Sequence, residues 1–292
     1  MAVHWKQDAG LNARMILSFV ILGVLYLIFL SILHYLGVGY IPLAIIASVM
    51  VLAQWYFSDK IVLWSSGAKI VSKEEYPRLH EIVERLSTNN GLPKPKVALV
   101  NTPVPNAFAT GKSPKSSLVA VTTGIMNLLE DDELEAVIGH ELSHVRSRDV
   151  LVLTLASVFS TVAWYLVQFG FFGGLQTRDR NTVGTTAIVM LVAIVTWIVS
   201  FLIIRAISRY REYSADRGGA IMTGKPDKLA SALLKISGRI GSVPPKELEK
   251  VQQLNAFFII PALSGSSIAN LFSTHPPVEK RVQRLMEMNR HE

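Results

Sequence analysis

The chain has 292 residues, half of them apolar, and its 29 Lys and Arg against 22 Asp and Glu give a formal net charge of +7. It contains no cysteine, which excludes a disulfide framework and any metal site built on thiolates, so a metal would have to be held by histidine and carboxylate. The high apolar fraction argues against an ordinary soluble protein and points towards the membrane.

Among the stretches without Asp, Glu, Lys and Arg, three are strongly apolar. The first covers 15–58, a run of 44 residues, and the others cover 150–177 and 181–204, with 28 and 24 residues. About 20 apolar residues cross a bilayer, so the first stretch is long enough for two helices. The apolar region of a cleaved signal peptide is much shorter. The sequence therefore predicts four transmembrane helices in two hairpins, near 15–36, 41–58, 150–172 and 184–206.

Lys and Arg in the connections predict the orientation of these spans. The outer connection carries only Arg178 and Arg180, whereas 59–149 carries eleven basic residues and 208–292 carries thirteen. We therefore expect both polar segments and both termini in the cytoplasm. The predicted parts are an N-terminal region with the first hairpin (1–58), a first cytoplasmic part (59–149), a second hairpin (150–207) and a second cytoplasmic part (208–292).

The polar segments combine helices with a few short strands. Helical spacing of apolar residues predicts a helix over 73–89, for which Ser72 and Glu75 form a capping box. Runs of β-branched residues predict strands at 96–100 and 117–124, with an edge strand or an ordinary loop between them at 105–111. Further helices are predicted over 126–145 and from the fourth span to Gly224. We expect an α+β membrane protein that is mainly helical, with a small β-sheet in its cytoplasmic part.

The segment HELSH, at 140–144, carries the main chemical signal. His140 and His144 are four residues apart, so in a helix both imidazoles point to one side and can bind one metal ion. Glu141 then lies beside the ion, where its carboxylate can take a proton from water. These residues are typical of a zinc hydrolase, although a helix that binds no metal could contain the same sequence. A third ligand is required.

The residues after His144 exclude the metzincin pattern, which needs a glycine and a third histidine there. Glu212 is the best candidate for the third ligand, because it lies on the helix that leaves the fourth span. Asp216, one turn later, is placed to accept a hydrogen bond from the far nitrogen of a ligand histidine. The competing interpretation is an interfacial helix in which Glu212 pairs with Arg209 or Arg211.

HELSH, REYSAD (211–216) and THPP (274–277), in this order and with a hydrophobic hairpin after the first, resemble the HtpX family of membrane zinc metalloproteases, which is related to the CAAX-prenyl endoproteases. The segments PNAFATG and GLPKPKVALV are also similar to that family. The resemblance extends from the first hairpin to about Arg284. It implies a zincin-like catalytic domain of the gluzincin type, with one zinc ion per chain held by His140, His144 and Glu212.

The resemblance also implies roles for residues outside the metal site. Asn106, Ala107, Phe108 and Ala109 match a segment that pairs, as an edge strand, with extended substrate. His275 is implied to stabilise the oxyanion of the transition state. Arg281 is implied to assist it by anchoring either the substrate or the histidine.

We therefore expect an integral-membrane zinc endopeptidase with a cytoplasmic active site, in an inner or plasma membrane. The resemblance implies membrane or misfolded polypeptides as substrates and a role in quality control. One alternative is a CAAX-type processing protease, although four spans are too few for the enclosed chamber of that branch. The other is a non-enzymatic metal-binding scaffold or transporter, which would need ionisable residues inside the spans, where only His34 lies. The sequence indicates no nucleic-acid partner and specifies no oligomeric state.

Overall fold

The computed structural model describes residues 9–37, 39, 41–171, 182–240, 242–243 and 275–289. It separates into two compact units, each assembled from segments that are distant in sequence. The helical unit comprises 9–56 and 152–207, and the mixed unit comprises the described parts of 57–151 and 208–292. The long helix α8 (Thr182–Thr223) contributes its apolar first part to the helical unit and its polar last part to the mixed unit.

The helical unit contains α1 (Ala9–Tyr35), α2 (Ile41–Tyr56), most of α7 (Asp149–Phe171) and the apolar part of α8. Among the described residues, three helices, α1, α7 and α8, are long and apolar enough to cross a membrane. A fourth candidate exists only if α2 is counted together with α3 (Ser58–Ser66), from which it is separated by a break. The second predicted span therefore stays a prediction, and the outer connection with Arg178 and Arg180 lies outside the described residues.

Helices α1, α7 and α8 contact one another through a small apolar cluster that includes Phe29, Leu33, Leu166 and Val189. The same helices expose many large apolar side chains elsewhere, such as Leu27 at 66% of its area. An apolar exterior of this kind is expected of helices whose surroundings are lipid tails, because lipid tails are as apolar as leucine.

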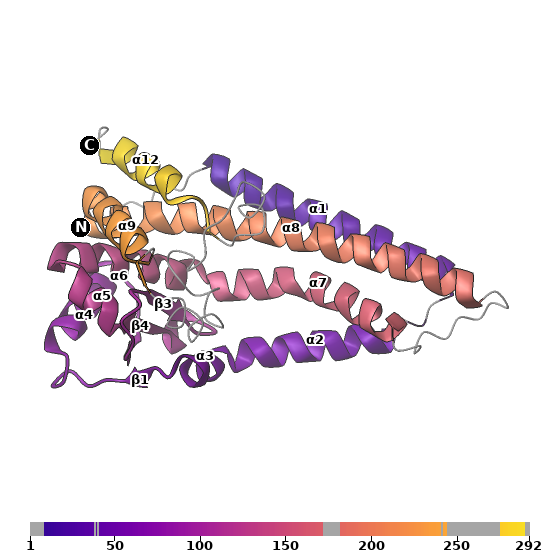
Figure 1. Cartoon of the computed structure of the whole chain (residues 1–292), viewed down its shortest axis with the longest axis horizontal. Coiled ribbons are helices and arrows are strands. Elements are labelled where there is room, and N and C mark those ends of the chain that lie inside the picture. The colour runs from indigo at the N-terminus through magenta and orange to yellow at the C-terminus, as the bar shows by residue number, and fades with distance from the viewer. Residues whose placement is uncertain are drawn as a thin grey trace. The chain divides into compact units, whose positions relative to one another are not determined.

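The mixed unit contains a four-stranded sheet in the order β1-β2-β4-β3. Strands β1, β3 and β4 are labelled in Figure 1. Strand β2 (Lys96–Val100) runs parallel to β4 (Leu118–Thr122), and β3 (Ala107–Thr110) runs antiparallel to β4. Strands β2 and β4 confirm the predicted strands, and β3 lies at the edge of the sheet, so of the two alternatives for 105–111 the edge strand is right. Strand β1 (Lys69–Ile70) was not predicted, because two residues are too few to show a strand period.

Both faces of the sheet are covered, because successive side chains of a strand point to opposite faces. Val97, Val119 and Ala107 face the main core, which also contains residues of three helices, α4 (Pro77–Asn89), α6 (Asp131–Ser147) and α9 (Pro226–Ile240). Their neighbours Ala98, Ala120 and Phe108 face the other way, into a second cluster with Val62 of α3.

The described part of the mixed unit contains five further helices. They are α4 (Pro77–Asn89), α5 (Thr123–Leu128), α6 (Asp131–Ser147), α9 (Pro226–Ile240) and α12 (Val278–Asn289), with a short 3-10 turn, η1 (Pro114–Ser116), between β3 and β4.

Two helix boundaries differ from the predictions. Ser72 and Glu75 do exchange the hydrogen bonds of a capping box, but α4 begins only at Pro77, since proline favours the first helical position and keeps the preceding Tyr76 out of helical conformation. The helix predicted over 126–145 is split into α5 and α6 at Leu129 and Glu130. Both residues adopt extended backbone angles, and Glu130 caps α6.

Candidate metal centre

Helix α6 is held tightly at its start. Glu130 and Glu133 form a capping box, and the side chain of Glu133 accepts the N–H of Glu130 at 2.9 Å. Lys235 of α9 lies 2.7 Å from Glu133, and Lys225, just before α9, lies 2.6 Å from Glu135. These buried carboxylates tie α6 to the segment that follows α8, which limits movement of the residues further along α6.

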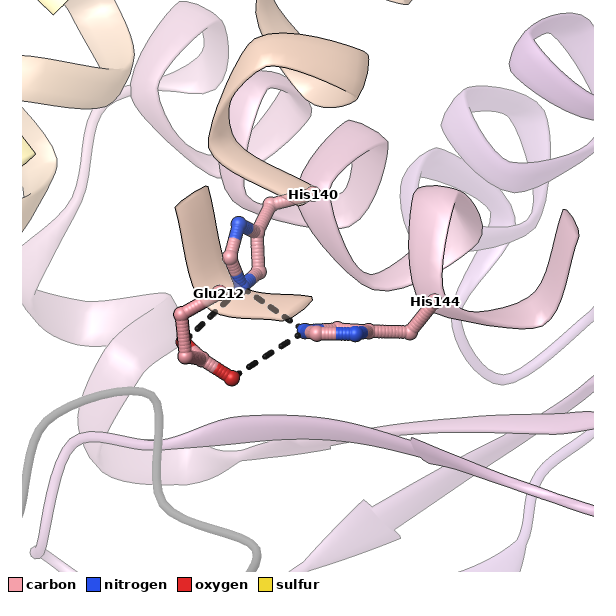
Figure 2. A group of neighbouring side chains, drawn as sticks. All are labelled: His140, His144 and Glu212. Carbon is pink, nitrogen blue, oxygen red and sulfur yellow. Dashed lines mark hydrogen bonds and ion pairs between the residues drawn. The ribbon is translucent and has the colours of Figure 1, made fainter. Parts of the chain in front are cut away.

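The motif lies on the last turns of α6. His140 and Glu141 are almost completely buried, whereas the side chain of His144 keeps 18% of its area exposed. The last part of α8 brings Glu212 to the two histidines, and the three side chains converge on one point (Figure 2). The Nε2 atoms of His140 and His144 are 3.1 Å apart, and they lie 3.7 Å and 3.5 Å from the carboxylate oxygens of Glu212.

These distances fit a small tetrahedral cation. Zinc binds nitrogen and oxygen ligands at about 2.0–2.2 Å, which places two ligands of a tetrahedron roughly 3.3–3.6 Å apart. The chemistry of the donor atoms agrees. Both histidines direct Nδ1 at a carboxylate, so their protons belong on Nδ1, and Nε2 of each ring carries a lone pair. Two lone pairs and a carboxylate facing one point repel one another unless a cation lies between them.

His140 is oriented by what we call the Asp216 arm, the chain of contacts from His140 to Asp216 to Arg281. Nδ1 of His140 lies 3.0 Å from Asp216, which in turn accepts hydrogen bonds from Nε and Nη2 of Arg281 at 2.8 Å and 2.6 Å. Nη1 of Arg281 also lies 3.4 Å from Glu212. Arg281 is completely buried, so one cation on α12 supports two acidic residues of α8.

His144 has a corresponding support that the sequence analysis missed, the Asp149 arm. Nδ1 of His144 lies 2.6 Å from Asp149, and Asp149 is paired with Arg211 of α8. Arg148 makes this contact possible, because it ends α6 in the left-handed region (φ 53°, ψ 44°) and turns the chain back towards His144. The only sequence signal was an aspartate five residues after His144, and it does not reveal such a turn.

Two glycines that the sequence analysis passed over allow α6 and α8 to approach closely. A Cβ atom on Gly219 would lie 2.6 Å from the backbone nitrogen of His140, and one on Gly139 would lie 2.6 Å from a methyl group of Thr223. Any larger residue would push the helix that carries Glu212 away from the helix that carries the histidines. Glycines beside His140 and soon after Asp216 were the available signal.

Burial and neighbouring charges set the protonation states at the centre. Burial lowers the pKa of both histidines, that of His144 to about 4, so each ring is neutral and able to bind a metal at neutral pH. Burial, together with the charge of Glu212, raises the pKa of Glu141 well above its ordinary value, against an opposing hydrogen bond from the backbone of Ala109. A bound cation would favour the charged form of Glu141 again.

The pKa of Glu212, in the polar part of α8, is shifted in the opposite direction to that of Glu141. Burial by itself would raise its pKa, but His275 and Arg281 together lower it well below the ordinary value. Nδ1 of His275 lies 3.0 Å from Glu212, so the histidine ahead of the two prolines is part of this cluster. Glu212 is therefore a carboxylate at neutral pH, as a metal ligand requires.

The structure also brings the predicted substrate segment to the centre. Asn106 is buried, and its backbone carbonyl accepts the N–H of Thr122 at 2.9 Å. Because hydrogen-bonded pairs alternate along an antiparallel ladder, the backbone groups of Ala107 and Ala109 face away from β4. A pocket lined by Ala109, His144, Asp149 and neighbouring residues lies beside this strand.

Comparison with known proteins agrees with this geometry. Residues 73–289 match the sequence model of Peptidase family M48. The chain is 53% identical over 289 residues to "Protease HtpX homolog 2" of Methanosarcina mazei, covering 99% of this chain and 98% of that one. It is also 53% identical over 285 residues to "Protease HtpX homolog" of Moorella thermoacetica, covering 97% and 95%.

A solved structure of Ste24p from S. mikatae resembles the fold, with a TM-score of 0.53 at 17% sequence identity. The match covers 92% of this chain, which spans 63% of the length of Ste24p. The apolar helices and these relatives identify a membrane protein, and the predicted likeness to the HtpX family is confirmed. The chain belongs to Peptidase family M48, as a membrane-associated metalloprotease of the HtpX type.

Proposed function

We propose that the chain is a zinc-dependent endopeptidase that cuts membrane or misfolded polypeptides. The observation that carries this proposal is the convergence of His140, His144 and Glu212 on one point, with Glu141 on the next position of α6. A zinc ion held by the three ligands supplies a Lewis acid and shifts the pKa of bound water towards about 7.

Glu141 is the proposed general base. Its carboxylate takes a proton from the attacking water as the water oxygen bonds to the peptide carbonyl carbon. The peptide C–N bond then breaks, and the same carboxyl group gives the proton to the leaving amine nitrogen. The backbone of Ala109, which hydrogen-bonds Glu141, keeps this group next to the edge strand. The proton therefore has a short path from water to leaving group.

Strand β3 is the proposed substrate site. An unpaired strand edge binds an extended peptide through backbone hydrogen bonds, with little demand on its sequence. Such binding suits a protease that acts on many unfolded chains. We propose that Asn106 and Ala107 begin this site, that Phe108 supports it from beneath, and that Ala109 aligns the peptide with Glu141.

His275 is proposed to donate a hydrogen bond to the oxyanion of the transition state, a contribution of about 2.7–4 kcal/mol for one donor. Of the two roles expected for Arg281, its complete burial and its pairing with Asp216 favour anchoring over direct contact with substrate. In this arrangement Arg281 acts through the ligands that it positions.

We propose four spans in an inner or plasma membrane, with both termini and the active site in the cytoplasm. The excess of basic residues in 59–149 and 208–292 supports this orientation. Labelling of single cysteines in intact cells tests it, since a cysteine at Arg178 should react with an impermeant reagent and one at Lys112 should not.

The replacement Glu141→Gln tests the catalytic proposal. We expect it to retain about one zinc per chain and to lower the rate of cleavage of an unfolded reporter protein by about 10²–10⁴-fold. His144→Ala is the matched control and should lose both zinc and activity. A chelator should stop cleavage by the unmodified protein, and added zinc should restore it. Full activity of Glu141→Gln would refute the proposed general base, and a metal-binding scaffold would show no cleavage in any variant.

The same variant has a second readout in the metal-free protein. The pKa of Glu141 is raised in the folded state, so its contribution to stability is present below the unfolded pKa of about 4.5 and is lost as pH rises through the folded pKa. Metal-free Glu141→Gln should therefore be more stable to heat than the unmodified protein at pH 8, with the advantage gone by about pH 4. If the difference in thermal stability between the variant and the unmodified protein were the same at pH 8 and pH 4, Glu141 would not be desolvated.

A further inference from the structure

Helix α3 (Ser58–Ser66) has two faces of different character. Val62 is buried on one face, in a cluster with Ala98, Phe108 and other residues of the sheet. Phe57, Ile61 and Trp64 lie on the opposite face at spacings of four and three residues, as neighbours along one side of a helix do.

The second face, which we call the Trp64 face, is apolar but exposed. The exposed fractions are 45% for Phe57, 45% for Ile61 and 88% for Trp64. Lys60 is exposed on the same side and its ammonium group lies 5.8 Å from the centre of the Phe57 ring. Contiguous apolar surface on a folded protein marks a site of contact with another apolar surface.

Covalent connection indicates what that surface is. Helix α2 ends at Tyr56 and α3 begins at Ser58, so a single residue separates α3 from an apolar helix of this membrane protein. Consecutive Cα atoms are about 3.8 Å apart, which keeps the start of α3 at the end of α2. At 16 residues α2 is roughly 24 Å long, shorter than the roughly 30 Å of a bilayer core, and short spans depend on interfacial residues at their ends.

The composition of α3 and the residues after it also fits a lipid surface. Tryptophan and phenylalanine favour the interface between lipid tails and water, and lysine extends from there to the headgroups. Lys60 is followed by Lys69 and Lys73. Basic residues close to a span are attracted by anionic lipids.

We propose that α3 is an interfacial helix, whose Trp64 face rests in the boundary between headgroups and acyl chains of the leaflet at which α2 ends. The mixed unit is then attached to the bilayer by a surface of its own, besides the helices that connect it to the membrane. Phe108 of β3 lies in the same cluster as Val62, so the anchored helix would hold the proposed substrate strand close to the lipid. Only this last consequence rests on the proposed function.

The chain lacks cysteine, which permits single labels at chosen positions. Trp64→Cys and Ile61→Cys, each labelled with an environment-sensitive fluorophore, would be reconstituted into vesicles of phosphatidylcholine and phosphatidylglycerol. Glu81→Cys, at an exposed position of α4, is the control. We expect lipids with a nitroxide near the top of the acyl chain to quench the labels at 64 and 61 at least twofold more than the label at 81. Iodide dissolved in the water should quench the label at 81 more strongly than the labels at 64 and 61.

Two outcomes would overturn the proposal. Labels at 64 and 61 that iodide quenches as strongly as the label at 81 would mean that the Trp64 face is in water. Labels protected from iodide and from lipid nitroxides, with energy transfer between labelled chains, would mean that a second copy covers it. Neither result depends on whether the protein cuts peptides.

A variant tests whether the apolar side chains cause the anchoring. Trp64 and Ile61 contribute little to the internal packing, so replacing both by serine should leave the zinc content unchanged. A label at Ser65→Cys should then become at least twofold more accessible to iodide than in the protein with Ile61 and Trp64 intact. Unchanged accessibility with normal zinc content would contradict the proposal.

Discussion

The two ligand histidines have the same kind of support but obtain it in different ways. The Asp216 arm joins three helices, and Arg281 comes from 65 residues beyond Asp216 to bind it with two nitrogens. The Asp149 arm depends on the turn between α6 and α7, where one left-handed residue returns the chain to His144. The first arm ends at His140, which is almost completely buried, although Asp216 borders a separate pocket. The second ends at His144, whose side chain keeps 18% of its area exposed and lines the pocket beside β3.

This difference indicates that the two arms contribute differently to the folded structure and to metal binding. The Asp216 arm joins α12 to α8 and α6, so it contributes to the folded structure as well as to the ligand. The Asp149 arm orients a ligand at the open side of the centre, where substrate would enter. Breaking the first should therefore destabilise the mixed unit more, and breaking the second should lower zinc affinity with a smaller loss of stability.

Arg281→Ala should have the largest effect of the changes considered. It leaves Asp216 and Glu212 buried without their shared cation, which typically costs about 3–5 kcal/mol. We expect a large loss of thermal stability in detergent together with loss of zinc. Arg284→Ala on the same helix is the control, because Arg284 lies over the ring of Tyr213 at an exposed position, where such a contact is worth about 0.5–1 kcal/mol. Equal stability of the two variants would contradict the structural role of the Asp216 arm.

Asp149→Asn and Asp216→Asn compare the two arms directly. Removing the partner of a ligand histidine usually lowers metal affinity by about 10–100-fold. We expect Asp149→Asn near the lower value, with lower melting of the metal-free protein because buried Arg211 loses its charged partner. Asp216→Asn should lie near the upper value with a larger fall in melting, because Asp216 joins α12 to α8 and α6. Zinc titration by competition with a chelating dye measures the first quantity and thermal unfolding the second. If Asp149→Asn binds zinc as tightly as the unmodified protein, the Asp149 arm has no role in the site.

Gly219→Ala tests the close approach of helices on which both arms depend. The added methyl group would lie 2.6 Å from the backbone of His140, and overpacking of this kind costs about 1–3 kcal/mol. Gly238→Ala on α9 is the matched control, since a Cβ atom there meets nothing within 4 Å. It should stabilise the protein by about 0.5–1 kcal/mol. Stabilisation by both changes, measured by thermal unfolding, would show that α6 and α8 have room to separate.

The sequence predicted the parts of the molecule whose signal is local. HELSH and the acidic residues of REYSAD are spaced by helical turns, and α6 and α8 do bring His140, His144 and Glu212 together. Strands β2 and β4 were predicted from short runs of β-branched residues, whereas β3 was left open between an edge strand and a loop. The apolar helices were predicted from uncharged stretches long enough to cross a bilayer, although α2 is separated from α3 by a break that hydropathy does not reveal.

What the sequence did not predict depends on backbone geometry or on contacts between distant segments. The break between α5 and α6 lies inside a stretch with continuous helical character, and it is made by the capping of Glu130. The approach of Gly139 and Gly219 requires knowing which helices cross. Asp149 was assigned no role, because its contact with His144 exists only if Arg148 adopts a left-handed conformation.

Arg148→Gly should have the smallest effect, and it tests whether the Asp149 arm depends on the backbone turn alone. A non-glycine residue in the left-handed region costs about 1–2 kcal/mol, and glycine removes this cost. Glycine also increases the conformational entropy of the unfolded chain, which offsets part of the gain in stability. We expect a gain in stability of about 0.5 kcal/mol with unchanged zinc affinity. Arg146→Gly, inside α6, should instead cost about 1 kcal/mol. If Arg148→Gly weakened zinc binding as Asp149→Asn does, the arginine side chain and not the turn would be holding Asp149 against His144.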